Sequence, residues 1–538
     1  MTRTTRAFAA AAAGLAIALV LPGGTPSDDC LWPWSAPATA RADEPTAPTL
    51  QFSARSRVRV APQSDIFAVR ETPTQWDPRH TAIIICDMWD WNACPSATRR
   101  ATELAPKINR VAAVAREAGV LIVHAPSNVM QYYQGTPQRK RAQEAPADPH
   151  APADLDKGCD RLDGEPALPI DDSDGGCDCQ PPCQPTAPRY KRQTDLIEIG
   201  PEDVISDSGR EQWNLFAQRG IENVILMGVH ANMCVLGRSF GLRQWARHGK
   251  NVVLVRDLTD AQYNPRKPPL VAHQRGTEMV VEHIEKYVCP SITSADLLGD
   301  PVPPHVVFLI GEDEYRTEET LPAFAASELV PRGVRCTFVL ADPQDRNHFP
   351  NIAVLREADL LVLSVRRRVL PPAEIAEVHA YLDAGRPLVG IRTASHAFEG
   401  KTAEATPAWG KFDLEVLGAD YLGHYSNKTP AGGVATLYQI VPEQAIQPLL
   451  TGIARGESRS ASSLYKNHDL ASTTTVLMTG HVEGQNEVEP VAWINSYRGG
   501  RIFYTSLGGA EDFQVPAFRR LLLSAVYWGL DHQVPAAE

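Results

Sequence analysis

Short apolar runs alternate with longer amphipathic stretches along most of this chain. The first run is at 82–86, and a helical stretch at 101–118 and a second apolar run at 120–123 follow it. Apolar runs of this length between helical stretches indicate strand–helix units, in which helices cover both faces of a mostly parallel sheet. The alternation therefore predicts an α/β fold.

This alternation occurs twice, on either side of a proline-rich segment. Residues 300–304 read Asp-Pro-Val-Pro-Pro, which cannot continue a helix or a central strand because proline lacks an N–H donor and fixes φ. A chain of 538 residues is also too long for one hydrophobic core. We therefore predict two tandem three-layer αβα domains with mostly parallel sheets, at 50–299 and 305–538, joined by a linker at 300–304. The strands predicted in the second domain are 305–310, 334–340, 360–364, 388–391 and 502–506.

The N-terminus has the pattern of a secretory signal peptide. Arg3 and Arg6 precede an apolar run at 7–21, and Ala40-Arg41-Ala42 forms a small-x-small cleavage site. The apolar run is shorter than the roughly 20 residues that a membrane-spanning helix needs. We therefore predict a signal peptide at 1–42, an exported protein that is periplasmic or secreted, and no transmembrane span in the mature chain.

The charge balance restricts the class of partner. The chain has 52 Lys and Arg against 64 Asp and Glu, a formal net charge of −12. Such a balance argues against nucleic acid as the main partner, since nucleic-acid binding needs a basic surface. We expect a small-molecule substrate, and the sequence is compatible with a homo-oligomer.

Two reactive side chains follow predicted strands of the first domain. Asp87 comes directly after the strand at 83–86, and Cys234 lies where a later strand meets a helix. Reactive groups of open α/β sheets gather at the carboxyl ends of the strands. A helix N-terminus stabilises a thiolate, its free amides can hold an oxyanion, and a neighbouring carboxylate can accept the thiol proton. Alternatively, Cys234 is a small buried hydrophobic side chain.

The segments around these two residues resemble a known family. Ile84-Ile85-Cys86-Asp87-Met88 looks like the opening strand of the isochorismatase-like cysteine hydrolases, and Gly228-Val229-His230-Ala231-Asn232-Met233-Cys234-Val235 is similar to their nucleophile segment. The resemblance covers about 81–298. It implies Asp87 as general base, Cys234 as nucleophile, and the backbone amides of Met233 and Cys234 as oxyanion donors. The implied reaction is hydrolysis of a small amide, imide or related acyl compound through a covalent cysteine intermediate, without a cofactor.

The chain departs from this family at its catalytic lysine. Asp207 stands at the lysine position, after Val204-Ile205-Ser206, and Lys191 or Arg192 are the candidate substitutes unless they are simply an exposed basic pair. Without a cation the thiol pKa is not depressed. A catalytically silent binding or scaffold protein is therefore the second hypothesis.

Several other side chains are candidates for the pocket of the first domain. The Asp-x-His metal motif of nicotinamidase-type relatives is replaced by Val123-His124-Ala125, so we predict no metal there. His124 either lines the pocket or is a structural hydrogen-bonding residue. The remaining candidates, whose aromatic members can instead pack the domain face, are Trp89, Trp91, Tyr132 and Asn232.

A segment at about 145–188 interrupts the alternation and is rich in Pro, Asp, Gly and Cys. It contains Cys159, Cys177, Cys179 and Cys183, which can bind zinc or form two disulfides. Their spacing matches no standard zinc pattern. Because an exported protein meets an oxidising compartment, we favour disulfides, with three connectivities open.

The second domain resembles the ThuA-like, trehalose-utilisation family, which has the class I glutamine amidotransferase-like fold. The resemblance runs over about 306–530 and rests on Gly311-Glu312-Asp313-Glu314-Tyr315, Gly390-Ile391-Arg392-Thr393-Ala394-Ser395 and Gly423-His424. An amidotransferase needs a cysteine at the turn after the central strand, where this chain has Arg392, so we do not expect glutamine hydrolysis.

Four side chains of this domain form a candidate pocket for a sugar or a carboxylate, or are ordinary polar residues at loop ends. They are Asp313, Arg392, His396 and His424. The resemblance supplies the third hypothesis, a carbohydrate-binding or carbohydrate-processing protein led by the second domain.

Overall fold

The computed structural model describes residues 49–537 except 93, 184–189, 301 and 401–405. The predicted signal peptide lies outside these residues. Among the helices that are described, none combines the length and the apolar character needed to cross a membrane.

The first sheet has eight strands in the order β2-β1-β8-β7-β6-β3-β4-β5. All pairs from β8 to β5 are parallel, and β1 is antiparallel to both of its neighbours. The central strand β3, Thr-Ala-Ile-Ile-Ile-Cys, is buried along its whole length, as expected of a strand covered on both faces. The strands are β1 (Leu50–Arg59), β2 (Phe67–Trp76), β3 (Thr81–Cys86), β4 (Leu121–Ala125), β5 (Val204–Ile205), β6 (Asn223–Val229), β7 (Asn251–Asp260) and β8 (Ser291–Ile292).

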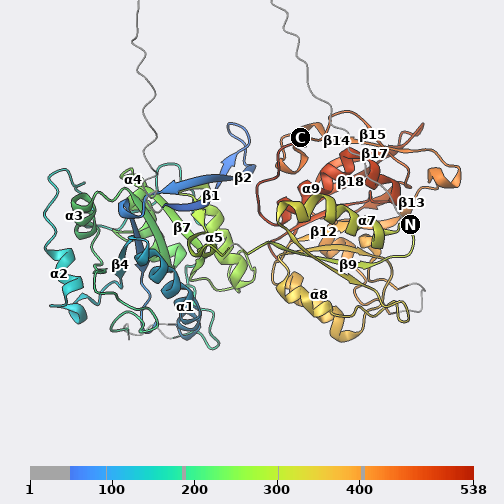
Figure 1. The fold of residues 1–538 in the computed structure, drawn as a ribbon. Helices are drawn as coiled ribbons and strands as arrows, with labels where there is room; N and C mark the ends of the chain where they lie inside the picture. Colours follow the sequence, from blue (N-terminus) through green and yellow to red (C-terminus); the bar gives the residue numbers. More distant parts are fainter. Residues whose placement is uncertain (1–48, 93, 184–189, 301, 401–405, 538) are drawn as a thin grey trace, which may run out of the picture. The chain divides into compact units, whose positions relative to one another are not determined.

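Helices cover both faces of this sheet (Figure 1). Ile83 and Ile85 of β3 pack in one hydrophobic cluster with α1 (Pro95–Glu117) and α6 (Ser294–Leu298). Ile84 belongs to a second cluster on the opposite face, because successive side chains of a strand point to opposite sides. That face is covered by α2 (Pro137–Gln143), α3 (Gly209–Arg219), α4 (Leu242–Arg247) and α5 (His273–Tyr287).

The second sheet has nine strands in the order β10-β9-β11-β12-β19-β18-β17-β14-β15. The first five are parallel and the last four continue the sheet in antiparallel fashion. A separate antiparallel pair is formed by β13 (Asp420–His424) and β16 (Tyr465–His468). The nine strands are β9 (His305–Gly311), β10 (Arg335–Leu340), β11 (Leu360–Val365), β12 (Leu388–Ile391), β14 (Thr436–Ile440), β15 (Ser458–Ser460), β17 (Thr475–Val482), β18 (Val488–Tyr497) and β19 (Gly500–Thr505).

Helices also cover both faces of the second sheet. The helices α7 (Thr317–Phe324) and α9 (Pro516–Gly529) pack on one face, and α8 (Pro372–Asp383) packs on the other (Figure 1). The prediction of an α/β protein with two mostly parallel sheets is confirmed. The five parallel strands of the second sheet are the five that the apolar runs predicted.

The antiparallel strands were not predicted. A strand with one exposed face alternates polar and apolar residues instead of forming an apolar run. The first half of β1 shows this alternation, with Phe52 and Ala54 buried and Gln51 and Ser53 exposed. The strand β18 does contain a short buried apolar run, Val491-Ala492-Trp493, which the sequence analysis did not recognise as a strand.

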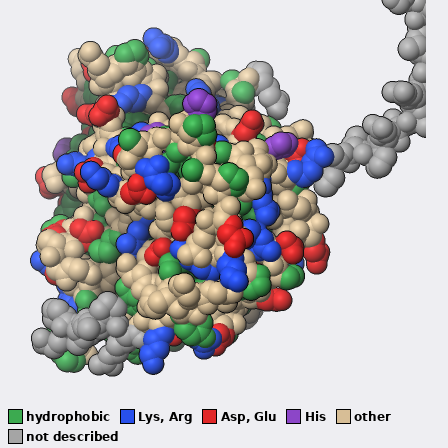
Figure 2. Space-filling model, turned by 90° about the vertical axis from the view of Figure 1, so that its left-hand side faces the viewer, with side chains coloured by type: hydrophobic (Ala, Val, Ile, Leu, Met, Phe, Trp, Pro, Cys, Tyr) green, Lys and Arg blue, Asp and Glu red, His purple; other side chains and the backbone are tan. Residues whose placement is uncertain are grey.

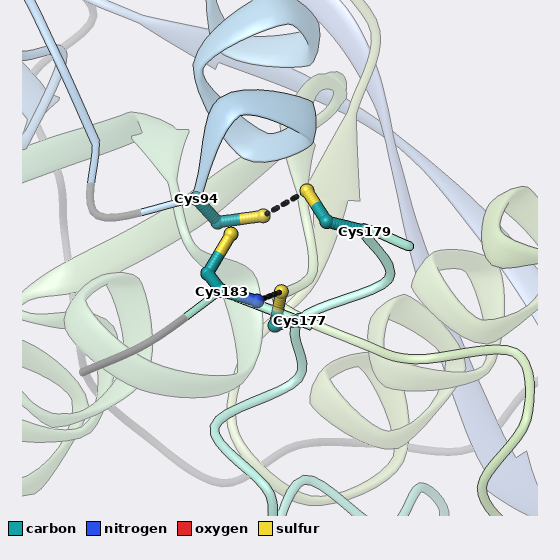
Figure 3. A group of neighbouring side chains, drawn as sticks. All are labelled: Cys94, Cys177, Cys179 and Cys183. Carbon is teal, nitrogen blue, oxygen red and sulfur yellow. Dashed lines mark hydrogen bonds between the residues drawn. The ribbon is translucent and has the colours of Figure 1, made fainter. Parts of the chain in front are cut away.

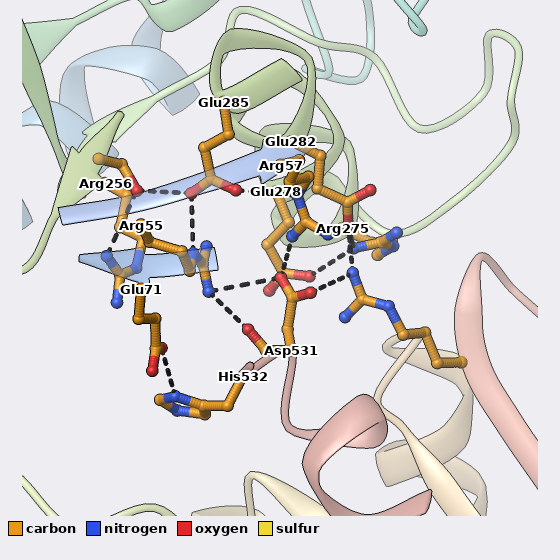
Figure 4. A network of polar contacts seen from close by, with 12 residues as sticks. Arg55, Arg57, Glu71, Arg256, Arg275, Glu278, Glu282, Glu285, Asp531 and His532 are labelled. Carbon is orange, nitrogen blue, oxygen red and sulfur yellow. Dashed lines mark hydrogen bonds and ion pairs between the residues drawn. The ribbon is translucent and has the colours of Figure 1, made fainter. Parts of the chain in front are cut away.

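The strand β1 also carries part of a network of largely buried ion pairs (Figure 4). Arg55 and Arg57 each place Nε 2.8 Å from the Glu285 carboxylate of α5. Arg57 also pairs with Asp531, and Arg501 lies 2.8 Å from both Asp531 and Glu282. Each buried charge therefore has an opposite partner, which offsets the cost of removing it from water.

Charged side chains are mixed on the face of the molecule drawn in Figure 2. Acidic and basic groups lie next to one another over this face. A surface of this kind exerts little long-range attraction on a polyanion, because neighbouring charges of opposite sign cancel at a distance.

Candidate active site

The ends of β3 and β6 lie side by side at the carboxyl edge of the first sheet. The two strands are parallel, with Cys86 opposite Gly228. A Cβ at Gly228 would lie 2.1 Å from the backbone oxygen of Cys86, so only glycine allows this close approach. The strand ends thus bring Asp87 next to the segment that follows Val229. That segment is a π-helix, η3 (Ala231–Val235), which carries Cys234 and follows a cis peptide bond between Val229 and His230.

Asp87, Cys234 and Arg238 form a connected group, here called the Cys234 site. The Asp87 carboxylate lies close enough to the Cys234 thiol to raise its pKa, and Arg238 donates from Nε to Asp87 Oδ2 at 3.2 Å. The other carboxylate oxygen accepts the backbone N–H of Ser127 at 2.7 Å. Asp87 is fully buried, whereas the side chain of Arg238 is one-third exposed. A carboxylate held this way is fixed in position to exchange a proton with the thiol.

Burial and charge set the protonation states of this group. Burial raises the pKa of Asp87, although the Arg238 guanidinium opposes that rise. Burial and the neighbouring Asp87 charge raise the pKa of Cys234 to about 12. The resting state at neutral pH therefore contains a neutral thiol, and the thiol proton must leave as the sulfur attacks.

The cation beside Asp87 is Arg238, which the sequence analysis did not identify. Its backbone N–H donates to the Cys234 carbonyl at 3.1 Å, so it lies one helical turn after the thiol on the same segment. Residues four apart share one face of a helix, and this spacing is the signal that could have found it. The sequence resemblance implied a cation at the position of Asp207, whose carboxylate here accepts the Asn128 N–H at 2.9 Å.

The two predicted substitutes for the lysine make other contacts. The Arg192 guanidinium pairs with Asp195 and lies 5.7 Å from the ring of Tyr132. The backbone N–H of Lys191 donates to Asp90 at 2.9 Å. The structure therefore places Arg238, and not this basic pair, against Asp87.

One predicted oxyanion donor is already engaged. The backbone N–H of Met233 donates to the His230 carbonyl at 3.0 Å, and the N–H of Val235 donates to the same oxygen at 3.2 Å. Both bonds belong to the turn that carries Cys234. Of the two backbone amides predicted as oxyanion donors, only that of Cys234 therefore stays a candidate.

His124 is a member of a buried polar network. Its Nδ1 lies 3.0 Å from Gln193 Oε1 and its Nε2 lies 2.9 Å from Asp203 Oδ2. Arg116 also donates to Asp203, at 2.7 and 2.9 Å. Burial alone would raise the pKa of Asp203. Its hydrogen bonds to His124 and Arg116 have the larger, opposite effect, so the pKa of Asp203 lies well below the ordinary range. Both ring nitrogens of His124 are used, so the structure favours its structural interpretation.

The other pocket candidates differ in their surroundings. Trp89 donates from Nε1 to the Ser127 carbonyl at 3.0 Å and stacks on Tyr190 at 4.4 Å, so it packs beside the Asp87 loop. Trp91 is half-buried, and Tyr132 is 54% exposed. Asn232 lies two residues before Cys234 and is buried.

Asn232 connects the nucleophile segment to the inserted segment at 145–188. Its Nδ2 donates to Asp172 Oδ2 at 2.8 Å and to the Gln262 carbonyl at 3.1 Å, and its Oδ1 accepts the Gln262 N–H at 2.8 Å. Both donors and the oxygen of its amide side chain are thus bonded to the protein. Asn232 therefore positions the segment that carries Cys234.

The predicted disulfides of the inserted segment are not present in the structure. All nine cysteines in the described residues are free thiols. Cys159 donates to the Asp160 carbonyl at 3.3 Å and does not join the other three cysteines of the segment. Cys94, at the start of α1, instead lies beside Cys177, Cys179 and Cys183, because folding brings α1 against the inserted segment.

The second sheet has a different polar group at the corresponding edge, here called the Arg392 centre. Arg392 follows β12 directly and is buried, with φ of 45°. Its guanidinium donates to the Ser506 carbonyl at 2.6 Å, to Ser463 Oγ at 3.1 Å and to the Tyr315 hydroxyl at 3.2 Å. It lies 4.3 Å from the ring of Tyr315 and 4.4 Å from that of Tyr465, which are cation–π distances. Arg392 Nε has no hydrogen-bond partner among the described residues.

The other candidates from the part of the chain that forms the second sheet lie either near this centre or in a separate ion pair. His396 stacks on Tyr421 at 4.5 Å, and the ring of His424 lies 6.3 Å from that of Tyr465. Burial, reinforced by nearby arginines, lowers the pKa of His396 well below its ordinary value. Asp313 instead pairs with Arg368 at 2.6 Å and with Arg346.

Comparison with known proteins matches one part of the chain to a family. Residues 306–529 match the family model of ThuA, described as trehalose utilisation. No curated protein matches the sequence. The solved structures that the chain resembles include a ThuA-like protein from Parabacteroides merdae ATCC 43184, with 14% identity, a TM-score of 0.33, and coverage of 44% of this chain and 93% of that one.

Two further solved structures are cysteine hydrolases or their relatives. A cysteine hydrolase from Pseudomonas syringae pv. phaseolicola 1448A is 15% identical, with a TM-score of 0.27, and the match covers 42% of this chain and 94% of that one. An isochorismatase family protein from Burkholderia thailandensis is 14% identical, with a TM-score of 0.24, and the match covers 41% and 96%. Both families that the sequence resembles thus occur among the proteins similar to this chain.

Proposed function

We propose that this protein is a cysteine-dependent hydrolase of a small amide, imide or related acyl compound. The observation that carries the proposal is the Cys234 thiol beside a buried Asp87 carboxylate, to which Arg238 donates at 3.2 Å. A thiol, a base within hydrogen-bonding reach and a group that orients the base are the requirements of nucleophilic catalysis. A purely structural cysteine needs no buried ion pair beside it.

The reaction proceeds in two stages. Cys234 Sγ attacks the acyl carbon while Asp87 takes the thiol proton, and the substrate oxygen becomes an oxyanion. Asp87 then gives the proton to the leaving nitrogen, the C–N bond breaks, and a thioester remains on Cys234. In the second stage Asp87 takes a proton from water, the water oxygen attacks the thioester carbon, and the released sulfur takes the proton back.

Arg238 makes this proton exchange feasible in a buried site. Burial alone favours the neutral form of a carboxyl group, which cannot accept a proton. The guanidinium opposes this effect at Asp87 and also faces the developing charge on sulfur. In this proposal Arg238 has the role that the family assigns to its lysine.

The test is covalent capture of an acyl group on Cys234. The purified chain is incubated with a library of small amides, imides and activated acyl esters, and each adduct is located by intact mass and peptide mapping. Cys336→Ala is the matched control, because this half-buried thiol of β10 lies in the other sheet. We expect adducts on Cys234 in the wild type and the control and none in Cys234→Ala. Absence of any acyl adduct on Cys234 would favour the silent scaffold instead.

A second candidate function, carbohydrate binding, is favoured by the ThuA match and the Arg392 centre. Aromatic rings around a buried cation with an unpartnered Nε offer both an apolar wall and a hydrogen-bond donor. A ligand that binds only the folded state raises the melting temperature. Thermal-shift measurements on the full chain with trehalose and other neutral sugars, repeated on Arg392→Met, test this function.

We also propose that the protein is exported, on the pattern of residues 1–42. The measurement is the N-terminal sequence of the chain recovered from the culture medium or the periplasm. Cleavage after Ala42 supports export, and an intact N-terminus in the cytoplasm contradicts it.

A further inference from the structure

Four cysteine side chains converge outside the Cys234 site. The Sγ atoms of Cys94, Cys177, Cys179 and Cys183 all lie within 4.8 Å of one another. Figure 3 shows the four side chains pointing toward one another, one from the start of α1 and three from the inserted segment. The sulfur atoms of Cys94 and Cys179 are 3.5 Å apart.

These separations fit a metal ion better than they fit disulfides. A zinc ion bound by four thiolates has Zn–S bonds of about 2.3 Å in a tetrahedron, which places the sulfurs roughly 3.8 Å apart. A disulfide instead needs sulfurs at about 2.05 Å. The observed sulfur separations therefore lie near the edge length of the tetrahedron and well beyond a covalent S–S bond.

We propose that Cys94, Cys177, Cys179 and Cys183 bind a structural zinc ion as a tetrathiolate. All four ligands come from the protein, so the ion has no open position for a substrate. The site is separate from the Cys234 site, because none of the four cysteines belongs to that site, and zinc binding can be measured without any hydrolase activity.

The groups around the sulfurs suit bound thiolates. The Ser96 hydroxyl lies 3.1 Å from Cys179 Sγ, and the backbone N–H of Cys183 donates to Cys177 Sγ at 3.4 Å. Hydrogen bonds of this kind orient metal ligands and tune their basicity. They also fix two of the four sulfurs before a metal arrives.

An arginine offsets part of the charge of such a site. Zinc with four thiolates carries a net charge of −2. Arg266 donates to the carbonyl oxygens of Asp178 and Cys179 at 3.3 and 3.4 Å. Arg100 holds the same peptide through the Asp178 carboxylate at 2.8 Å, but its charge is matched by Asp178 and by Asp260 at 2.9 Å.

The zinc ion would fasten the inserted segment where it supports the nucleophile. Asp172 and Asp174, in the same segment, bond Asn232 and Asn264 at 2.8 Å each. Asn232 in turn lies two residues before Cys234. The structure describes no helix or strand in residues 145–183, so a metal bond replaces the stabilisation that backbone ladders would give.

The experiment measures zinc bound to the full chain. Protein purified under reducing conditions is dialysed against metal-free buffer, and its zinc content is determined by mass spectrometry. We expect about one zinc per chain in the wild type, since a structural site retains its metal through dialysis. Cys94→Ser and Cys179→Ser should lower the zinc content at least tenfold. Cys159→Ser, in the same segment but outside the cluster, should leave it unchanged.

Cobalt substitution tests the ligand set without any variant. A chain refolded with Co²⁺ should show the intense ligand-field absorption of a tetrahedral site and the charge-transfer bands of thiolate ligands. The proposal is overturned if the wild type binds neither ion while its cysteines are reduced. It is equally overturned if peptide mapping without reductant finds Cys94, Cys177, Cys179 and Cys183 joined in two disulfides.

Discussion

The Cys234 site and the Arg392 centre occupy corresponding places in the two sheets and differ in chemistry. Each follows a parallel strand inside its sheet, β6 or β12, and each contains an arginine. Arg238 faces a carboxylate and a thiol, whereas Arg392 faces carbonyl and hydroxyl oxygens and two tyrosine rings. The architecture therefore supplies the location, and the side chain at the strand end decides the chemistry.

The same comparison distinguishes the Cys234 site, where we expect a covalent reaction, from the Arg392 centre, where we expect only ligand binding. An arginine paired with a carboxylate is neutralised, and the pair can move a proton to or from a neighbouring thiol. An arginine among neutral groups keeps its charge available to a ligand that carries oxygen atoms. We therefore expect covalent chemistry at the first site and binding without reaction at the second.

The largest expected effect is the loss of the nucleophile. Cys234→Ala should reduce kcat/KM for an amide substrate by on the order of 10⁴-fold or more, because no other group can form the acyl intermediate. Steady-state kinetics on the best substrate of the library measure this loss. Arg392→Met is the matched control and should retain wild-type kcat/KM. A similar loss in that variant would break the proposed division between the two sites.

Removal of the base has the next largest effect. Asp87→Asn should lower kcat by about 10³-fold, within the usual range for general acid–base catalysis. In the wild type, burial raises the pKa of Asp87, and the carboxylate is the active form. Activity should therefore fall as the pH drops through this raised pKa, at a higher pH than for an exposed aspartate. A pH–rate profile without such an acidic limb would show that Asp87 is not the base.

The arginine of the Cys234 site should have a smaller effect with a distinct signature. Arg238→Gln should lower kcat by about 10²-fold, the effect of about 2.7 kcal/mol of lost charge stabilisation. It should also move the acidic limb to higher pH, because the cation that opposes the raised pKa of Asp87 is lost. Arg238→Lys keeps the positive charge, so the acidic limb of its pH–rate profile should stay at the wild-type pH. A limb that does not move in Arg238→Gln would mean that the arginine has only a structural role.

The smallest effect is expected at the Arg392 centre, and it concerns stability. Arg392→Met leaves the Ser506 carbonyl and the Ser463 hydroxyl without their donor, which should cost about 2 kcal/mol of local stability. Hydrogen–deuterium exchange of peptides covering β12 and β19 measures this change. Unaltered exchange there would show that water or another group replaces the guanidinium.

The parts of the Cys234 site differ in how well the sequence predicts them. Asp87 and Cys234 stand out because each follows an apolar strand, and two such strands in parallel bring their ends together. Arg238 was missed because it lies outside the motif, and only the helical continuation of the segment turns it toward Asp87. Pairing between distant segments has no periodic signal, which is why Cys94 was not grouped with cysteines more than 80 residues later.

The fold shows the same division. Strands covered on both faces were found from their apolar runs, as β3 and β9 were. A strand with an exposed face, such as the first half of β1, alternates polar and apolar residues and is hard to distinguish from the surrounding loops. Polar contacts between distant residues are also not predictable from the sequence pattern. The Glu165 carboxylate, for example, binds Arg243 at 2.6 Å and His283 at 2.9 Å.

The raised pKa of Cys234 has a consequence for the lifetime of the protein. Oxidation of cysteine to sulfenic acid and beyond proceeds through the thiolate, so a thiol with a pKa of about 12 is almost entirely in its unreactive form at neutral pH. If Cys234 is the nucleophile that we propose, it is shielded from peroxide before substrate binds, and proton transfer to Asp87 ionises it only during turnover. The proposed hydrolase should therefore tolerate oxidants that inactivate proteins with a permanently ionised cysteine.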